Sequence, residues 1–132
     1  MSGEVADTGA LPSWSDSSTT IAEIARTIAA FNAERDWGQY HSARNLAMAL
    51  SVEAAELLEL YLWSSDAGPQ PAVASREPRV AEEAADVLIC LLSLAAHAKL
   101  DLSAAVAAKL AKNAEKYPIA TARGRLEKSD EL

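Results

Sequence analysis

Apolar residues recur at helical spacing from Thr20 onward. Thr20 and Glu23 have the spacing of a capping box, in which each side chain accepts a bond from the other residue's backbone N–H. The apolar residues that follow lie three or four positions apart, as on one face of a helix: Ile21, Ile24, Ala25, Ile28 and Phe31. We therefore expect a first helix from Thr20 to about Arg35, followed by a connection over residues 36–41.

Three further stretches predict helices, at about residues 42–63, 77–100 and 101–117. Pro78 is tolerated in a first helical turn, and Asp101 is a suitable N-cap for the last helix, which ends before Pro118. The pattern predicts an all-α fold, an antiparallel helical bundle of about four helices per chain, completed by oligomerisation. We divide the chain into a flexible N-terminal arm (1–18), a helical domain (19–118) and a polar, extended C-terminal tail (119–132).

The second and third predicted helices are apolar on most of their faces. A helix that is apolar all round needs to be surrounded by protein. Four helices in a chain of 132 residues can hardly cover two such helices. We therefore expect a second copy of the chain to complete the core.

Charge and composition narrow the possible functions. A net charge of −7 and a pI of about 4.8 disfavour a nucleic-acid polymer as a partner. The longest apolar run, residues 87–96, is too short to span a membrane, so we expect no membrane contact. The N-terminal residues lack the apolar core of a signal peptide, and the single cysteine, Cys90, cannot form an internal disulfide. Both features favour a cytoplasmic location.

Two pairs of acidic residues stand within apolar sequence, Glu53 with Glu56 and Glu83 with Asp86. The i,i+3 spacing places both carboxylates of a pair on one face of its helix. Four inward carboxylates would repel one another and lose hydration unless cations balance them. Because Mg²⁺ prefers oxygen ligands, this pattern predicts a Mg²⁺ site and, through it, phosphate chemistry.

Spacing alone does not exclude other acidic residues as metal ligands. Glu59 lies three residues beyond Glu56, and Glu82 lies four residues before Asp86. Acidic pairs on helices are usually solvated, but here two pairs share apolar surroundings, which favours an inward site. A carboxylate-bridged di-iron site is disfavoured because it needs a His three residues after a Glu, and neither histidine has that spacing.

Several motifs, in this order, resemble the all-α nucleoside triphosphate pyrophosphohydrolases of the MazG-like group, and most of all their dCTP pyrophosphatase branch. The group's signature is Glu-x-x-Glu, a spacer and Glu-x-x-Asp, which the two acidic pairs match. Residues 33–46, Trp63 and residues 109–118 resemble the flanking motifs of that branch. The resemblance covers roughly residues 20–126.

The resemblance implies a Mg²⁺-dependent enzyme that cleaves (d)NTPs, dCTP or a related pyrimidine nucleotide, between the α and β phosphates. The products would be a nucleoside monophosphate and pyrophosphate, a reaction that cleans the nucleotide pool. It implies a homodimer or homotetramer with each site beside the neighbouring chain. It implies catalytic metal ligands at Glu53, Glu56, Glu83 and Asp86, phosphate contacts at Lys109, Asn113, Lys116 and Tyr117, and base contacts at Trp37, His41, Arg44, Asn45 and Trp63.

Two departures from the relatives bear on the base. Ile28 stands where dCTP-hydrolysing relatives have His, and Cys90 stands where many relatives have Tyr. Neither is a metal ligand, so the base preference stays open. The alternative to an enzyme is a non-catalytic helical dimerisation or nucleotide-sensing module. Such a module is expected to have lost one of the four acids, and this chain keeps all four.

Overall fold

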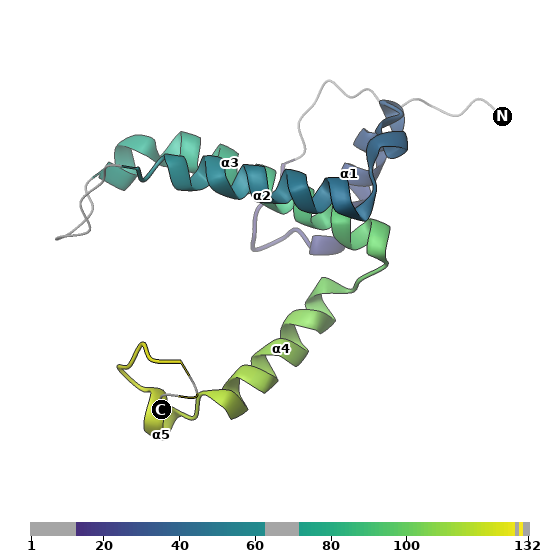
Figure 1. The fold of residues 1–132 in the computed structure, drawn as a ribbon. Helices are drawn as coiled ribbons and strands as arrows, with labels where there is room; N and C mark the ends of the chain where they lie inside the picture. Colours follow the sequence, from purple (N-terminus) through teal and green to yellow (C-terminus); the bar gives the residue numbers. More distant parts are fainter. Residues whose placement is uncertain (1–12, 63–71, 129, 131–132) are drawn as a thin grey trace.

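The computed structural model describes residues 13–62, 72–128 and 130, and all regular secondary structure in these ranges is helical (Figure 1). This confirms the predicted all-α class. The elements are α1 (Ile21–Glu34), the 3₁₀ helix η1 (Trp37–Tyr40), α2 (Ala43–Glu59), α3 (Ala72–Ala98), α4 (Leu102–Lys116) and α5 (Ile119–Ala122).

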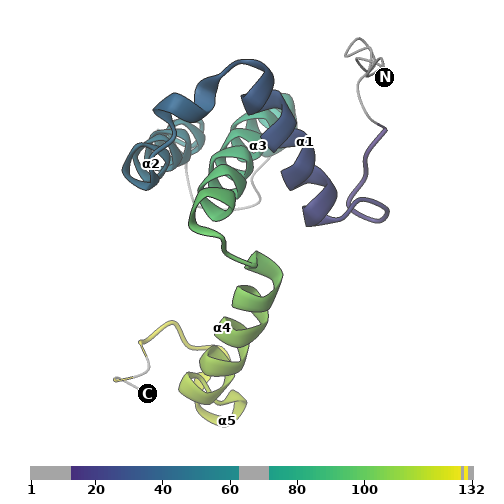
Figure 2. The ribbon, with the colours of Figure 1, turned by 90° about the vertical axis from the view of Figure 1, so that its right-hand side faces the viewer.

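Helices α1, α2 and α3 form the body of the chain. α2 and α3 lie side by side and antiparallel, and α3 lies between α2 and α1 (Figures 1 and 2). The buried apolar side chains of the described residues are few: Ile28, Leu46, Leu60, Leu92 and Ala95. Large apolar side chains on α2 stay open to solvent, among them Val52 (55% exposed) and Leu58 (69%). One chain therefore leaves much of its apolar surface uncovered.

The predicted caps are confirmed. The Thr20 hydroxyl accepts the Glu23 N–H at 3.2 Å, and the Glu23 carboxylate accepts the Thr20 N–H at 2.7 Å. The Asp101 carboxylate accepts the Ala104 N–H at 2.9 Å and so starts α4. Each cap satisfies backbone donors that the first turn of a helix leaves open.

The second helix ends earlier than predicted, and the third helix begins earlier than predicted. α2 ends at Glu59, and residues 60–62 continue in a turn. Its hydrogen bonds span three residues instead of four, as in the bond from the Tyr61 N–H to the Leu58 C=O at 3.0 Å. Such tightening is common where a helix ends. α3 begins at Ala72, five residues before the predicted start, so Pro78 lies inside the helix rather than in its first turn. Residues 72–77 hold no Gly or Pro, which leaves nothing to stop the helix extending towards the N-terminus.

α4 turns away from the body at a defined corner. Lys99 has a left-handed backbone (φ 54°), and the Leu100 N–H donates to the Ala95 C=O at 2.8 Å. With the Lys99 N–H donating to the Ala96 C=O, this is a Schellman motif that ends α3 at Ala98, two residues before the predicted end. The axes of α3, from Pro78, and α4 differ by 99°, and α4 extends away from the other helices (Figure 2).

Short local structure occurs in both segments that flank the predicted helical domain. Residues 13–18, part of the predicted arm, include a turn in which the Ser18 N–H donates to the Ser15 C=O at 3.1 Å. The predicted extended tail begins instead with the short helix α5. The predicted loop 64–71 and the rest of the arm lie outside the described residues. Within the described part of the chain, no single helix combines the length and apolarity needed to cross a membrane, and only α3 and α4 taken as one bent pair reach that threshold.

Candidate functional site

Three of the four predicted metal ligands meet between α2 and α3. Carboxylate oxygens of Glu53, Glu56 and Glu83 lie within 4.8 Å of one another. The pairing follows from helix geometry, because the i,i+3 acids of α2 face the side of α3 that carries Glu83. Asp86 is exposed one turn beyond Glu83, and its negative charge acts on both Glu53 and Glu83.

Loss of hydration and mutual repulsion disfavour ionisation at Glu53 and Glu83. The pKa of Glu53 is raised, first by loss of hydration and then by the negative charges of Glu56 and Asp86. The pKa of Glu83 is raised by the same causes in the same order, and the nearby Arg79 guanidinium partly offsets this rise. Sequence reasoning missed Arg79, although it lies four residues before Glu83 on α3, the spacing of an intrahelical ion pair.

The donor set fits a hard divalent cation. Oxygen ligands about 2.0–2.1 Å from one Mg²⁺ lie at most about 4.2 Å apart, so oxygens within 4.8 Å need only small side-chain movements to share an ion. The oxygens carry negative charge that no described lysine or arginine neutralises by a direct ion pair. Glu59 and Glu82 lie outside the three-acid group, whereas Glu56, which is equally exposed, belongs to it. The geometry thus favours Glu56 and Glu83 over these two alternatives.

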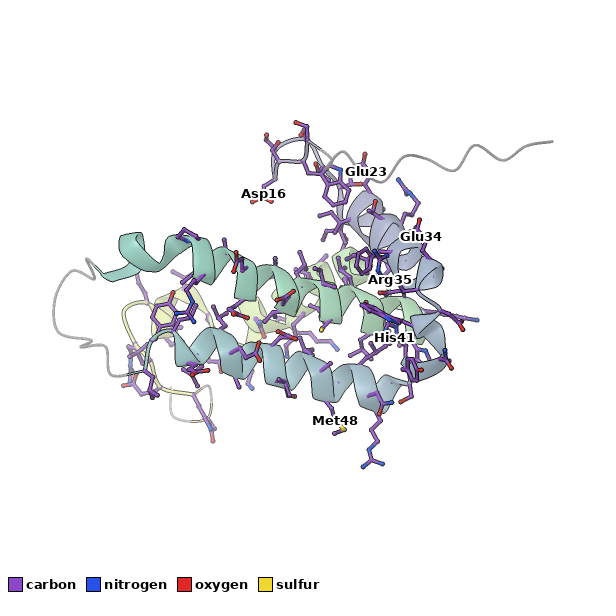
Figure 3. The ribbon with its side chains drawn as sticks, turned by 90° about the horizontal axis from the view of Figure 1, so that it is seen from above. Asp16, Glu23, Glu34, Arg35, His41 and Met48 are labelled. Carbon is purple, nitrogen blue, oxygen red and sulfur yellow. The ribbon has the colours of Figure 1, made fainter. Side chains whose placement is uncertain are left out.

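A cavity of about 200 Å³ lies between α1 and α3, beside η1 and the start of α2. Its wall is mostly apolar, and its polar lining includes His41, Asn32 and Ser93. Figure 3 shows His41 where η1 leads into α2. Leu46 and Ser93 in its lining lie seven residues from Glu53 and Asp86 respectively, which is about 10 Å along each helix. The cavity and the acids are therefore separated by about two helical turns.

The predicted base-binding residues have different environments. His41 lines the cavity. Trp37 is 43% exposed and packs edge-on against Phe31, with ring centroids 5.7 Å apart. The Asn45 side-chain amide donates to the Tyr40 C=O at 2.9 Å, which ties η1 to α2. Arg44 is exposed.

Trp63, the fifth predicted base contact, lies outside the described residues. Sequence reasoning also missed Asn32 and Ser93, the polar pair in the cavity. They are 61 residues apart in sequence, so no local spacing could have connected them.

The predicted phosphate-binding stripe lies on α4 and at its C-cap. Lys109 and Lys116 are exposed, Asn113 is half-buried, and the Tyr117 N–H donates to the Asn113 C=O at 2.8 Å. α4 has no extensive contact with α2 in this chain, and it diverges from the helix pair that carries the acids (Figure 1). One chain therefore does not bring the stripe and the acids together.

Comparisons with known proteins agree with the architecture and the acidic motif. The model of the MazG-like family matches residues 48–132, which include all four acids and α4. The chain is 47% identical to dCTP pyrophosphatase 1 of Rattus norvegicus over 107 residues, which are 80% of this chain and 63% of that protein. It is 45% identical to dCTP pyrophosphatase 1 of Homo sapiens over 115 residues, 86% of this chain and 68% of that one. The chain thus spans slightly less than two thirds of the rat relative.

A solved structure has the same fold. The crystal structure of a pyrophosphatase from Archaeoglobus fulgidus DSM 4304 superposes with a TM-score of 0.71 at 38% sequence identity. The match covers 74% of this chain and 92% of the archaeal one. Together with the family-model match, these likenesses show that the chain belongs to the MazG-like family.

Proposed function

We propose that this protein is a Mg²⁺-dependent nucleotide pyrophosphohydrolase. It cleaves a (d)NTP between the α and β phosphates and releases a nucleoside monophosphate and pyrophosphate. The observation that carries this proposal is the meeting of Glu53, Glu56 and Glu83, with Asp86 beside them, between α2 and α3. The names of the relatives, dCTP pyrophosphatase 1 and pyrophosphatase, support the same reaction class.

The acids provide the binding energy for the cation and for the phosphates that it carries. Each of the four offers an anionic oxygen from a rigid helix, so the ligands are held in place before the substrate arrives. When bound, Mg²⁺ would neutralise phosphate charge and lower the pKa of a coordinated water. A carboxylate of the same cluster can then accept a hydrogen bond from the attacking water and orient it.

The base is expected to lie in the cavity between α1 and α3. The cavity is about 10 Å from the acids along the helices, which suits a nucleotide whose triphosphate reaches the cluster. Its volume of about 200 Å³ is below the roughly 300–1,000 Å³ of pockets that hold a whole ligand, so it suits one ring. We therefore propose dCTP or a related pyrimidine nucleotide as substrate.

A second copy of the chain would complete the site. The exposed apolar surface of α2 supports self-association, because such a surface is costly to leave in water. Lys109, Asn113 and Lys116 are far along α4 from the body of their own chain, so a homodimer or homotetramer could present them to a neighbour's acids. Closed two-fold symmetry would then produce two equivalent sites per pair of chains.

A panel assay tests the function. The protein is incubated with the four dNTPs and four NTPs, with Mg²⁺ or with excess EDTA, and pyrophosphate is measured. We expect release with at least one pyrimidine nucleotide and none in EDTA. Absence of hydrolysis across the panel, in a protein shown to be folded, would instead favour a non-catalytic nucleotide-sensing or dimerisation module.

A further inference from the structure

The cavity between α1 and α3 contains a polar pair to which the proposed reaction assigns no role. The Asn32 side-chain amide on α1 donates to the Ser93 hydroxyl on α3 at 3.4 Å. Both side chains are half-buried and line the cavity. Among the described residues, the Asn32 side chain makes no second hydrogen bond, so its carbonyl oxygen and one N–H stay available.

We propose that Asn32 is a specificity-determining residue that hydrogen-bonds the edge of the substrate base, and that Ser93 positions its amide. The inference rests on the proposed nucleotide pyrophosphohydrolase activity and names the residue that selects the base. The half-buried amide of Asn32 faces a mostly apolar cavity, and a ligand in that cavity can use the donor and the acceptor that the bond to Ser93 leaves over.

The orientation of the amide favours one kind of base. With Nδ2 directed to Ser93, Oδ1 accepts from an exocyclic amino group while the remaining N–H donates to an adjacent ring nitrogen. Cytosine has this donor and acceptor side by side. Uracil and thymine present a carbonyl oxygen in place of the amino group. They would set oxygen against oxygen unless the amide turned over, which exchanges its N–H bond to Ser93 for one that the Ser93 hydroxyl donates to Oδ1.

The cavity lining around Asn32 and Ser93 increases the discrimination between bases. Ile28, Leu46 and Leu92 supply apolar wall next to the pair, so that a mismatched polar group finds other side-chain partners in the cavity lining only at His41 and His97. A site built to hydrogen-bond a group rejects an analogue lacking it more strongly than an apolar pocket does. The cavity also excludes a second fused ring more readily than a single one, because its volume is only about 200 Å³.

The test compares dCTP with dUTP, which differ in the base only at this edge. kcat and KM are measured with Mg²⁺ for the full chain, for Asn32→Leu, which is similar in shape and apolar, and for Ser93→Ala. Thr27→Val serves as the matched control, because Thr27 is exposed on α1 and outside the cavity, and its hydroxyl bonds only the Glu23 C=O at 3.1 Å.

We expect the unmodified chain to prefer dCTP. Asn32→Leu should lower kcat/KM for dCTP on the order of 10- to 100-fold and change dUTP little, so that the preference collapses. Ser93→Ala should narrow the ratio several-fold through KM with kcat nearly unchanged, and Thr27→Val should leave the ratio as it was. If Asn32→Leu does not fold by circular dichroism, Asn32→Asp replaces it. That variant keeps the acceptor for the amino group of cytosine but replaces the N–H donor by a second acceptor, so it should lower kcat/KM for dCTP through the lost bond to the ring nitrogen.

The possible outcomes distinguish the role of Asn32 from the pyrophosphohydrolase function on which it rests. A folded Asn32 variant that keeps the dCTP preference, or that slows dCTP and dUTP equally, overturns the role of Asn32 and leaves the pyrophosphohydrolase function standing. An unmodified chain that hydrolyses both nucleotides equally also overturns it. A chain that hydrolyses neither nucleotide nor any other triphosphate overturns the proposed function, and this inference with it.

Discussion

Glu53 on α2 and Glu83 on α3 present carboxylate oxygens within 4.8 Å of each other, although they belong to different helices and carry the same charge. Both have a raised pKa, caused first by loss of hydration and then by neighbouring carboxylates. Repulsion of this kind persists in a fold only when the rest of the structure outweighs it. A bound cation would turn this unfavourable arrangement into a favourable one.

Removing one charge from the cluster should lower activity by orders of magnitude. Glu56→Gln and Asp86→Asn keep the size of the side chain but lose an anionic ligand, so kcat/KM should fall by at least about 100-fold. The metal-free protein should hold its stability or gain some, because repulsion is relieved. Steady-state kinetics and thermal denaturation in EDTA measure the two effects. Glu82→Gln is the matched control, because Glu82 is exposed and outside the three-acid group.

Retention of most activity by both variants at saturating Mg²⁺ would refute the assignment. A large loss in the Glu82→Gln control would shift the metal site towards the i,i+4 alternative of Glu82 with Asp86.

The raised pKa values predict how the metal-free protein responds to pH. A carboxyl whose pKa is higher in the folded state stabilises the fold below its unfolded pKa, near 4.5, and this contribution is lost as pH rises through the folded pKa. Through Glu53 and Glu83, the free energy of unfolding should therefore fall as pH rises from mildly acidic to neutral. The pKa of Glu23 is lowered by its capping bonds to Thr20, so Glu23 stabilises the fold more as pH rises. The effect of the acidic cluster must therefore be measured separately from that of Glu23.

A difference measurement isolates the cluster. Unfolding by urea in EDTA is compared between the unmodified chain and Glu53→Gln at pH 5 and pH 8. The variant should gain stability relative to the unmodified chain at pH 8 and gain less at pH 5. Added Mg²⁺ at pH 8 should stabilise the unmodified chain more than the variant. Equal differences at both pH values would show that Glu53 titrates alike in the folded and unfolded chain.

Trp37 tests the predicted base contact. Its ring is 43% exposed and held edge-on by Phe31, so one face can stack on a nucleobase. Trp37→Ala should mainly raise KM, with kcat/KM falling on the order of 10-fold, if stacking is equal in the ground and transition states. Trp14→Ala is the control, because Trp14 is equally exposed but precedes α1. An unchanged KM would remove Trp37 from the site.

Self-association should depend on the exposed apolar face of α2. Leu58→Glu places a charge where the side chain is 69% exposed in one chain, and it should weaken assembly and activity together. Thr27→Glu on α1 controls for the added charge. Light scattering and activity are followed across a dilution series. A folded monomer with full activity would contradict both the assembly and the shared site.

The sequence predicted the parts of the fold that local chemistry decides. The caps at Thr20 and Asp101 depend on residues three positions apart, so they could be predicted from spacing. The end near Glu59 could not, because helix formers surround it and no strong breaker follows directly. The start of α3 was misplaced because Pro78 suits a first helical turn, although Pro71 directly precedes Ala72 in the sequence. The corner at Lys99 was missed for another reason, since glycine is the usual residue at a left-handed position.

The candidate site divides in the same way. The i,i+3 rule put each acidic pair on one face, and packing of α2 on α3 then brought Glu53, Glu56 and Glu83 together. The meeting of Asn32 with Ser93 depends on how α1 crosses α3, which periodicity does not specify. The departure of α4 from the body was equally hidden, because an apolar stripe does not tell whether its own chain or another will cover it.

The identity of the products tests the central claim most directly. dCTP is incubated with Mg²⁺ and the chain, with Glu56→Gln run in parallel, and the products are separated by anion-exchange chromatography. The account predicts equal amounts of dCMP and pyrophosphate from the unmodified chain, and almost none from the variant. Recovery of dCDP with orthophosphate, or equal turnover by the variant, would contradict it.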